Sequence, residues 1–414
     1  MTQQTVRRRH VFFLSGFDPK GASYYHRLYA AGAADQALAS GHAYDVGHRA
    51  RTEDAHVQQW QVGWRGDASG PTEPVETTLE FLAWDDLVRA HWPRGIAGVA
   101  WGSVLAYVAA LSSGLALVRV WRQSRRTLIA LAYPAMLWLL ALLIGAVLGG
   151  LAAQLTARVG AASAWPPAKT WALAWGLATV ACVGSWWGAL RLERKLHTSW
   201  LLRIYRFADI WAGGKLPDMD ARLDAMAARV HERLQRQDAD EVLLVGYSVG
   251  SMLAASVMAR VLVKCGNDAG NDGGSGTSAA QRLSLLTLGQ CIPLLGLMPR
   301  AHRFRRELGV LAAAADLCWV DYSSPTDWGS FALVDPLQMC RVAPAGSRAL
   351  APIMRSPRFH TLFDAEDYVQ LRKNKRRMHL QYLMASPKVG DYDYFLMTAG
   401  PWRLSHGLRK GSPH

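Results

Sequence analysis

The chain alternates short apolar runs with amphipathic segments, on both sides of a long and strongly apolar middle region. Apolar runs that stop at a turn-forming residue are typical of buried strands. They occur at 10–15, 78–84, 242–245, 283–288 and 317–322. Apolar residues at helical spacing predict helices at 22–39, 85–92 and 221–235. The segments 43–48 and 57–64 alternate weakly and predict a hairpin. Because strands alternate with helices, we expect a mainly parallel sheet flanked by helices.

The middle region contains three stretches without charge, at 95–118, 127–157 and 170–190. About 20 apolar residues suffice to span a bilayer, so each stretch is long enough. Tryptophans near the ends of the third stretch match the aromatic belts of membrane interfaces. They are Trp171, Trp175, Trp186 and Trp187.

A fold that uses sequence from both flanks requires both flanks on one side of the membrane, which an odd number of spans forbids. We therefore expect a hairpin, with spans at 128–153 and 170–190. The least hydrophobic stretch, 95–118, would lie along the membrane surface or pack on the hairpin. Basic residues lie on the flank sides of both spans, which the positive-inside rule assigns to the cytoplasm. They are Arg119, Arg122, Arg125, Arg126, Arg191, Arg194 and Lys195.

The predicted organisation is a first domain part at 1–94, a membrane insert at 95–200 and a second domain part at 201–414. The expected location is a bacterial-type inner membrane, multi-pass, with the folded domain in the cytoplasm. Small residues on the first span could pack in a homo-oligomer, but the sequence leaves the oligomeric state open. They are Gly145, Gly149 and Gly150.

The composition favours some classes of binding partner over others. The net charge is +14, and many basic residues lie beside apolar segments, so an anionic bilayer explains the charge better than a nucleic acid does. No basic–aromatic pattern of an RNA-binding kind occurs. The five cysteines are scattered, which fits a reducing compartment, and no Cys/His set has zinc spacing. We therefore expect no nucleic acid, no metal and no cofactor.

The most specific motif is Gly246-Tyr247-Ser248-Val249-Gly250, between a predicted strand and a predicted helix. A strand that turns directly into a helix brings backbone close to backbone, where a Cβ would clash. The turn exposes the Ser248 hydroxyl with a helix N-terminus behind it, which favours a developing negative charge. Ser248 is therefore the candidate nucleophile.

A nucleophilic serine needs a base, and the base needs an orienting acid. On such a turn the acid and then the histidine follow the serine in sequence. Asp327, on a loop after the strand 317–322, is the preferred acid. The alternatives are Asp321, which reads as structural within the strand, and Asp335, which reads as a turn or cap.

His379 is the preferred base and His360 is the alternative, since both follow Asp327 in the chain. His406 and His414 lie near the end of the chain and are less favoured. For the oxyanion hole, one donor would be the backbone N–H of Val249 and the other that of Phe17, in the loop after the first strand.

These motifs resemble those of the α/β-hydrolases of the lipase and esterase kind. The resemblance rests on Ser15-Gly16-Phe17, the Ser248 motif, 324–327 and a later histidine, and it excludes the insert. Many members have His-Gly in the oxyanion loop, whereas here Ser15 precedes Gly16. The resemblance implies an α/β-hydrolase-like sheet, here interrupted by the predicted membrane hairpin. It also implies hydrolysis of an acyl ester or thioester, lipid-like or soluble, through an acyl-serine. The alternative is a non-catalytic membrane scaffold on a degenerate fold.

Overall fold

The computed structural model describes residues 5–66, 73–92, 105, 107–108, 118, 120–122, 125–196, 198–272, 281–342 and 352–406. The chain forms two compact units. One comprises 1–92, 109–127 and 207–414, and the other comprises 93–108 and 128–206. Helix α7 (Thr198–Ala212) belongs in part to each.

The first unit is built on a nine-stranded mixed sheet. Its strands are β1 (Arg8–Leu14), β2 (Ala43–Val46), β3 (Ala50–Arg51), β4 (Val57–Arg65), β5 (Val75–Leu82), β6 (Glu241–Tyr247), β7 (Leu283–Leu288), β8 (Cys318–Tyr322) and β9 (Ile353–Arg355). They follow the order β2-β4-β5-β1-β6-β7-β8-β9, with β3 paired to β4. All pairings from β5 through β9 are parallel, which confirms the predicted mainly parallel sheet. The antiparallel pairing of β2 with β4 confirms the predicted hairpin.

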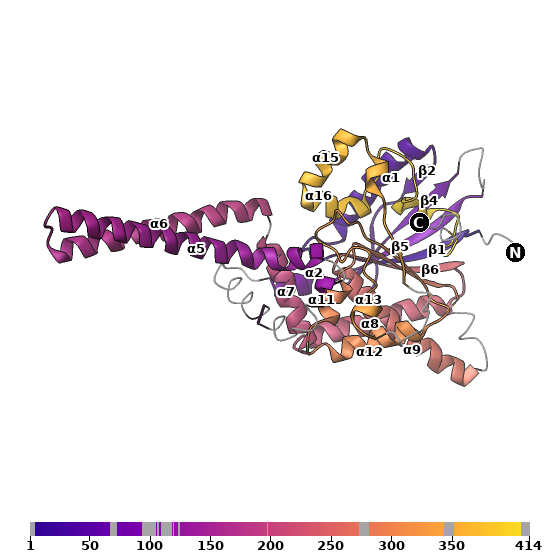
Figure 1. The fold of residues 1–414 in the computed structure, drawn as a ribbon. Helices are drawn as coiled ribbons and strands as arrows, with labels where there is room; N and C mark the ends of the chain where they lie inside the picture. Colours follow the sequence, from indigo (N-terminus) through magenta and orange to yellow (C-terminus); the bar gives the residue numbers. More distant parts are fainter. Residues whose placement is uncertain are drawn as a thin grey trace. The chain divides into compact units, whose positions relative to one another are not determined.

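Helices cover both faces of the sheet. They are α1 (Ala22–Ser40), α2 (Asp85–Ala90), α8 (Pro217–Gln235), α9 (Gly250–Asp272), α11 (Ile292–Gly296), α12 (His302–Ala313), α13 (Pro336–Met339), α14 (Phe359–Leu362), α15 (Ala365–Lys373), α16 (Lys375–Leu380), η1 (Gln381–Leu383) and α17 (Tyr394–Ala399). Figure 1 shows α1, α15 and α16 on one side of the sheet and α8, α9 and α12 on the other. The central strand β6 is buried along its whole length, as the apolar run from Val242 to Val245 predicts.

A buried arginine at the start of β1 ties the C-terminal segment to the sheet. Arg9 donates from Nε to Glu241 at the start of β6 (2.8 Å). Its two other nitrogens donate to the carbonyls of Gly400 (2.6 Å) and Trp402 (2.5 Å). Because the arginine is paired with a carboxylate and also donates to two carbonyls, its charge is tolerated in the core.

The second unit contains two long helices, α5 (Arg125–Ala162) and α6 (Pro167–Leu196), joined by a tight turn. They pack against each other as a hairpin. Ser185 Oγ on α6 donates to the Ala141 carbonyl on α5, and the Trp138 and Trp186 rings lie 4.7 Å apart. Glycine surfaces bring the helices together, because an added Cβ at Gly145 would lie 3.3 Å from Cys182 Cα. An added Cβ at Gly149 would lie 3.3 Å from Ala178 Cβ, whereas nothing lies within 4 Å of Gly150. Gly145 and Gly149 therefore serve contacts inside the hairpin, and of the three glycines only Gly150 faces open space.

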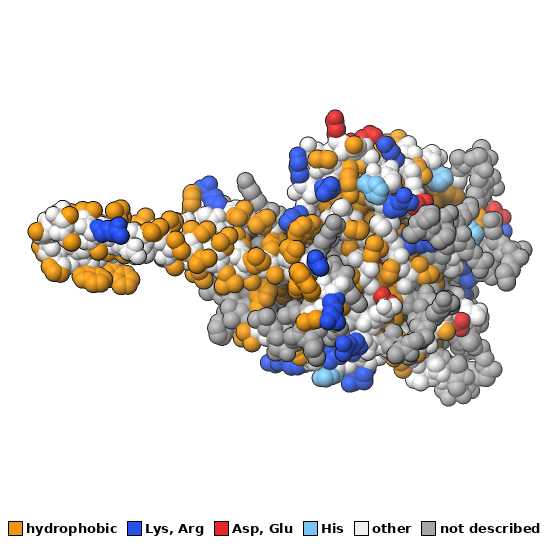
Figure 2. Space-filling model, viewed as in Figure 1, with side chains coloured by type: hydrophobic (Ala, Val, Ile, Leu, Met, Phe, Trp, Pro, Cys, Tyr) orange, Lys and Arg blue, Asp and Glu red, His pale blue; other side chains and the backbone are white. Residues whose placement is uncertain are grey.

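Both helices are long and apolar enough to cross a membrane, over Leu131–Ala162 and Pro167–Glu193. Only 17% and 11% of their most apolar windows are buried inside the structure, so these helices differ from the core helices of a water-soluble domain. Figure 2 shows hydrophobic side chains along the exposed face of this hairpin. The predicted spans 128–153 and 170–190 fall within α5 and α6. The predicted surface segment 95–118 lies almost wholly outside the described residues.

Candidate active site

Ser248 occupies the turn between β6 and α9 with a backbone φ of +57°. Such an angle is uncommon for a residue with a Cβ and costs about 1–3 kcal/mol, so surrounding contacts must impose it. The Ser248 N–H donates to the Leu288 carbonyl of β7 (2.8 Å), and the Ser248 carbonyl accepts from the Ser251 N–H (3.0 Å). These bonds fix the turn at the carboxyl edge of the parallel strands, with the α9 N-terminus directly after it.

Glycines on both sides of Ser248 allow the close approach. An added Cβ at Gly246 would lie 2.7 Å from the Ala254 Cβ on α9. At Gly250 it would collide with the Leu14 carbonyl oxygen and come within 2.5 Å of the Ser15 carbonyl oxygen. The start of α9 is therefore pressed against the end of β1, as the motif predicts.

The loop after β1 lies beside the serine. An added Cβ at Gly16 would be 3.1 Å from Ser248 Cβ and 3.4 Å from its Oγ. The next side chain, Phe17, is buried among aromatic rings, with centroids 5.0 Å from Phe207 and 6.1 Å from Trp84. The Trp84 indole N–H donates to the Ser15 carbonyl (3.0 Å). Aromatic packing thus holds the backbone of this loop at the Ser248 turn.

Val249, the other predicted oxyanion donor, is fully buried immediately before α9. The first N–H groups of a helix have no acceptor within it, and they carry the positive end of the helix dipole. The backbone near Val249 therefore provides a favourable electrostatic setting for an anion at Ser248.

Asp327 and His379 are in contact. His379 Nδ1 lies 2.8 Å from Asp327 Oδ2, and both side chains are buried. Asp327 also accepts from the Gly329 N–H (2.9 Å) and from the Tyr382 hydroxyl (3.1 Å). Burial alone would raise the pKa of Asp327, but the charge and hydrogen bond of His379, helped by the Gly329 N–H, hold this pKa below its ordinary value. Since the carboxylate is an acceptor, the Nδ1 atom of His379 carries the proton and Nε2 is its basic nitrogen.

Tyr247 connects this pair to the serine turn. Its hydroxyl donates to the His379 carbonyl (3.1 Å), and the two rings lie 5.2 Å apart. Because Tyr247 directly precedes Ser248, its contact with His379 brings α16 to the end of β6, beside the serine turn. The three preferred residues, from segments far apart in the sequence, therefore converge on one edge of the sheet.

The alternative residues lie in other settings. Asp335 caps α13 by accepting from the N–H groups of Leu337 (2.8 Å) and Gln338 (3.2 Å), which is the cap expected from the sequence. His360 is exposed on α14, with its ring 6.2 Å from that of Tyr368. The His406 ring stacks on Trp402 at 4.6 Å. His414 lies outside the described residues.

Asp321 is a buried structural acid at the end of β8. It accepts from the hydroxyls of Thr287 (2.7 Å) and Ser323 (2.7 Å). Burial raises its pKa to about 7, although both hydrogen bonds act to lower it. A carboxyl of this kind binds a proton near neutral pH and is poorly suited to hold an imidazolium.

Two contributors had no sequence signal. Tyr382 donates to Asp327 and accepts from the Ser324 N–H (2.7 Å). It therefore braces the loop after β8 that carries Asp327, here called the acid loop. It lies three residues after His379, a helical spacing that identifies a neighbour only once the helix is known. Cys291, after β7, donates from its thiol to the Gly329 carbonyl (3.2 Å), and burial raises its pKa to about 12, although the nearby Ser248 side chain acts to lower it. The thiol is therefore protonated and serves as a neutral neighbour of the serine.

Among the residues that the structure describes, no group of three or more His, Cys, Asp and Glu side chains could hold a metal ion. Comparisons with protein-family models, with curated proteins and with solved structures find no match.

The Gly250 contact predicts a specific stability loss. Gly250→Ala places a methyl group against the Leu14 and Ser15 carbonyls, and we expect the free energy of unfolding to fall by about 3 kcal/mol. Gly309→Ala is the matched control, because Gly309 lies within α12 and nothing lies within 4 Å of its added Cβ. It should raise stability by up to about 1 kcal/mol. Thermal unfolding of the detergent-solubilised protein measures both changes, and equal changes would contradict the proposed packing.

The raised pKa of Asp321 predicts a pH-dependent stability. Between the unfolded pKa near 4 and the folded pKa of about 7, the folded state binds more protons, so stability falls as pH rises through this window. Asp321→Asn removes this titrating group. The stability of the variant relative to wild type should therefore be higher at pH 8 than at pH 5, by on the order of 2 kcal/mol. Melting temperatures of both proteins at the two pH values test this. If the two proteins lose the same stability between pH 5 and pH 8, Asp321 does not titrate as described.

Proposed function

We propose that the protein is a membrane-anchored serine hydrolase with an α/β-hydrolase-like domain, which cleaves carboxylic esters through an acyl-serine intermediate. The observation that carries the proposal is the buried 2.8 Å contact between His379 and Asp327, next to a turn that holds Ser248 at positive φ. A strained serine beside a helix N-terminus and a carboxylate-oriented imidazole are the parts that nucleophilic catalysis requires.

The proposed mechanism uses these groups in sequence. His379 Nε2 takes the proton of the Ser248 hydroxyl as Oγ attacks the ester carbonyl carbon. The resulting oxyanion is bound by the backbone N–H groups of Val249 and Phe17. Collapse of the tetrahedral intermediate breaks the bond to the alkoxy leaving group, which receives the proton from His379. Water, deprotonated by the same imidazole, then releases the acid and regenerates the serine.

Asp327 keeps the imidazole in the required tautomer and stabilises its protonated form. Its lowered pKa supports this role, because the carboxylate stays ionised across the physiological range. The bracing hydroxyl of Tyr382 and the Gly329 N–H fix the carboxylate orientation.

The topology supports an α/β-hydrolase-like arrangement. The serine follows β6, the acid follows β8, and the histidine comes after the last strand β9. In that class the nucleophile turn is followed in the chain by the acid and then by the histidine. The loop after β1, a neighbour of β6 in the sheet, supplies the second oxyanion position.

The two apolar helices support a lipid-like substrate and a bacterial-type inner-membrane location. Both flanks of a two-span hairpin return to one side, and the Arg residues at the start of α5 and the end of α6 favour the cytoplasm. Cation–ring contacts occur near both ends of α6, with Lys169 4.4 Å from the Trp165 ring and Arg191 4.1 Å from the Trp187 ring. Such pairs suit the two interfaces of a bilayer.

Active-site labelling tests the chemistry. We expect a fluorophosphonate probe to label wild-type protein in membranes, and Ser248→Ala to abolish labelling because the nucleophile is gone. His379→Ala should slow labelling and ester hydrolysis by about 10²–10⁴-fold, as expected for loss of a general base. His360→Ala is the matched control, since that exposed ring lies against Tyr368 rather than Asp327, and it should keep the wild-type rate.

Each contrary outcome has a defined meaning. Equal loss in His360→Ala would move the base to α14. Full hydrolase activity in Ser248→Ala would exclude the proposed nucleophile. Absence of labelling in folded wild-type protein would favour the non-catalytic scaffold.

Cysteine accessibility tests the topology. We expect Ser163→Cys, in the exposed turn between α5 and α6, to react with a membrane-impermeant maleimide in intact spheroplasts. Leu38→Cys, on the α1 surface where the side chain is 88% exposed, should react only after permeabilisation. The parent protein measures the background from its native cysteines. Reaction of both sites in intact spheroplasts would contradict a cytoplasmic catalytic domain.

A further inference from the structure

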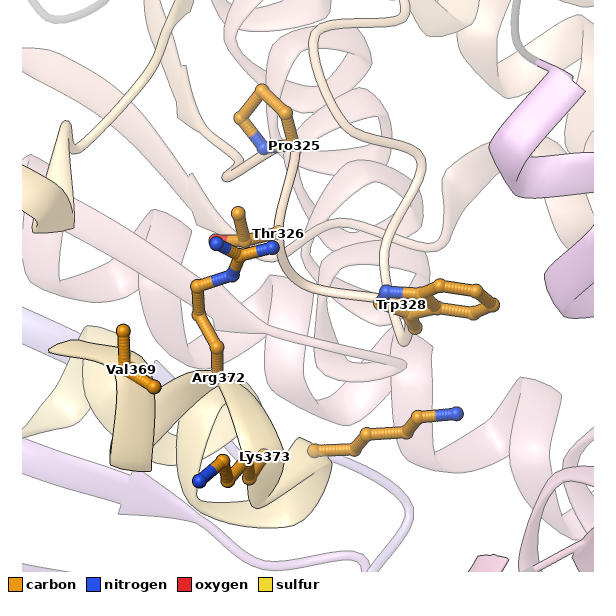
Figure 3. A pocket seen from close by; sticks show the side chains of 7 residues that line it. Pro325, Thr326, Trp328, Val369, Arg372 and Lys373 are labelled. Carbon is orange, nitrogen blue, oxygen red and sulfur yellow. The ribbon is translucent and has the colours of Figure 1, made fainter.

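A basic pocket lies beside the acid loop of the site. It has a volume of about 570 Å³, and its walls are Pro325, Thr326, Trp328, Val369, Arg372, Lys373 and Lys375. Figure 3 shows Arg372 extending from α15 toward Thr326, with Trp328 on another wall. Three of the seven lining residues are cationic, and none of the described residues in its walls is acidic.

The residues that line the pocket are neighbours in the sequence of the candidate site residues. Thr326 and Trp328 flank Asp327 on either side. Lys375 precedes His379 by four positions on α16, so the two residues lie on one face of that helix. Lys375 and His379 therefore project from positions about one helical turn apart.

The pocket walls are held in place by contacts to the acid loop. The Tyr368 hydroxyl donates to Thr326 Oγ1 (3.2 Å), and the Thr326 hydroxyl donates to Met378 Sδ (3.7 Å). Lys375 Nζ lies 4.4 Å from the Trp328 ring centroid. The loop, α15 and α16 are thus joined, which fixes the shape of the pocket in advance of binding.

Two of the three cations in the pocket are available to an anion. Arg372 and Lys373 are exposed and form no ion pair with any described residue. Partial burial lowers the pKa of Lys375, and a bound anion would offset that effect by favouring the ammonium form. Trp328 and Val369 are 42% and 45% exposed and offer apolar surface next to the cations.

We propose that this pocket binds the phosphate group of an amphiphilic acyl ester whose ester carbonyl lies at Ser248. A guanidinium and two ammonium groups match a phosphate with several charged oxygens, and the neighbouring apolar surface accommodates the attached carbon chain. This inference rests on the proposed ester hydrolysis and specifies its substrate class. The phosphate belongs either to a membrane lipid or to a water-soluble phosphorylated ester.

Two substrate pairs distinguish these sources. The soluble pair is the butyryl ester of glycerol phosphate and that of glycerol. The micellar pair is diacylglycerol phosphate and diacylglycerol in micelles of a neutral detergent. The measured quantity is kcat/KM for the phosphorylated ester divided by kcat/KM for its neutral partner.

We expect wild-type protein to prefer the phosphorylated ester, and Arg372→Gln/Lys373→Gln to reduce that ratio at least about tenfold, through KM, as two charge-assisted hydrogen bonds are lost. Arg306→Gln/Arg376→Gln removes the same charge from exposed positions outside the pocket and should leave the ratio unchanged. Arg372→Lys/Lys373→Arg keeps the charge and should retain the preference.

If Arg372→Gln/Lys373→Gln lowers the kcat/KM ratio in both substrate pairs, the pocket recognises the phosphate itself. If it lowers the ratio only in micelles, the pocket recognises a lipid head group. An unchanged ratio in both pairs, or an equal loss in the control, overturns the proposal.

A binding measurement distinguishes failure of the proposed hydrolysis from failure of the proposed phosphate pocket. If wild-type protein hydrolyses none of these esters, hydrolysis is excluded for them, and equilibrium dialysis with glycerol phosphate butyrate still tests the pocket. Arg372→Gln/Lys373→Gln should then weaken Kd about tenfold or more. An unchanged Kd overturns the pocket whatever the catalytic outcome.

Discussion

The close approach of α9 to the end of β1 is the constraint on which the candidate site depends. Glycine at 250 lets the helix start against two carbonyls of the β1 edge, and glycine at 16 lets the following loop lie on Ser248. The resulting turn forces Ser248 into positive φ and points the start of the helix dipole at it. The candidate nucleophile, the loop after β1 and the helix N-terminus are therefore one packing unit, and the Asp327–His379 pair joins that unit through Tyr247.

Much of this arrangement can be predicted from patterns among residues that are close together in the sequence. Continuous apolar runs identified β1, β6, β7 and β8, and the glycine spacing identified the Ser248 turn, because both signals come from residues that are neighbours in the chain. Charge-free length identified α5 and α6 in the same way. The bounds differ by a few residues where caps decide them: α8 begins at Pro217, four residues before the expected start, because a proline suits the first helical position.

What sequence pattern missed depends on contacts across the fold. Strand β9 has three residues and owes its existence to pairing with β8, and the short helices α14 to α17 have too few turns for a periodic signal. The same holds for the site. Asp327 could be preferred over Asp321 because it follows a strand, but the brace from Tyr382 and the thiol of Cys291 arise only when loops from different strands meet.

The position of the hairpin in the chain has a consequence for biosynthesis. In the sheet β1 lies between β5 and β6, and these two strands are separated in the sequence by the entire apolar region. Residue 10 on β1 is in register with residue 242 on β6, so the central pairing closes a loop of more than 200 residues. The ribosome must therefore deliver both apolar helices before the sheet can be completed. Both apolar helices are thus synthesised before the site can assemble, and the first domain part must wait with the β6 side of β1 uncovered until the second is synthesised.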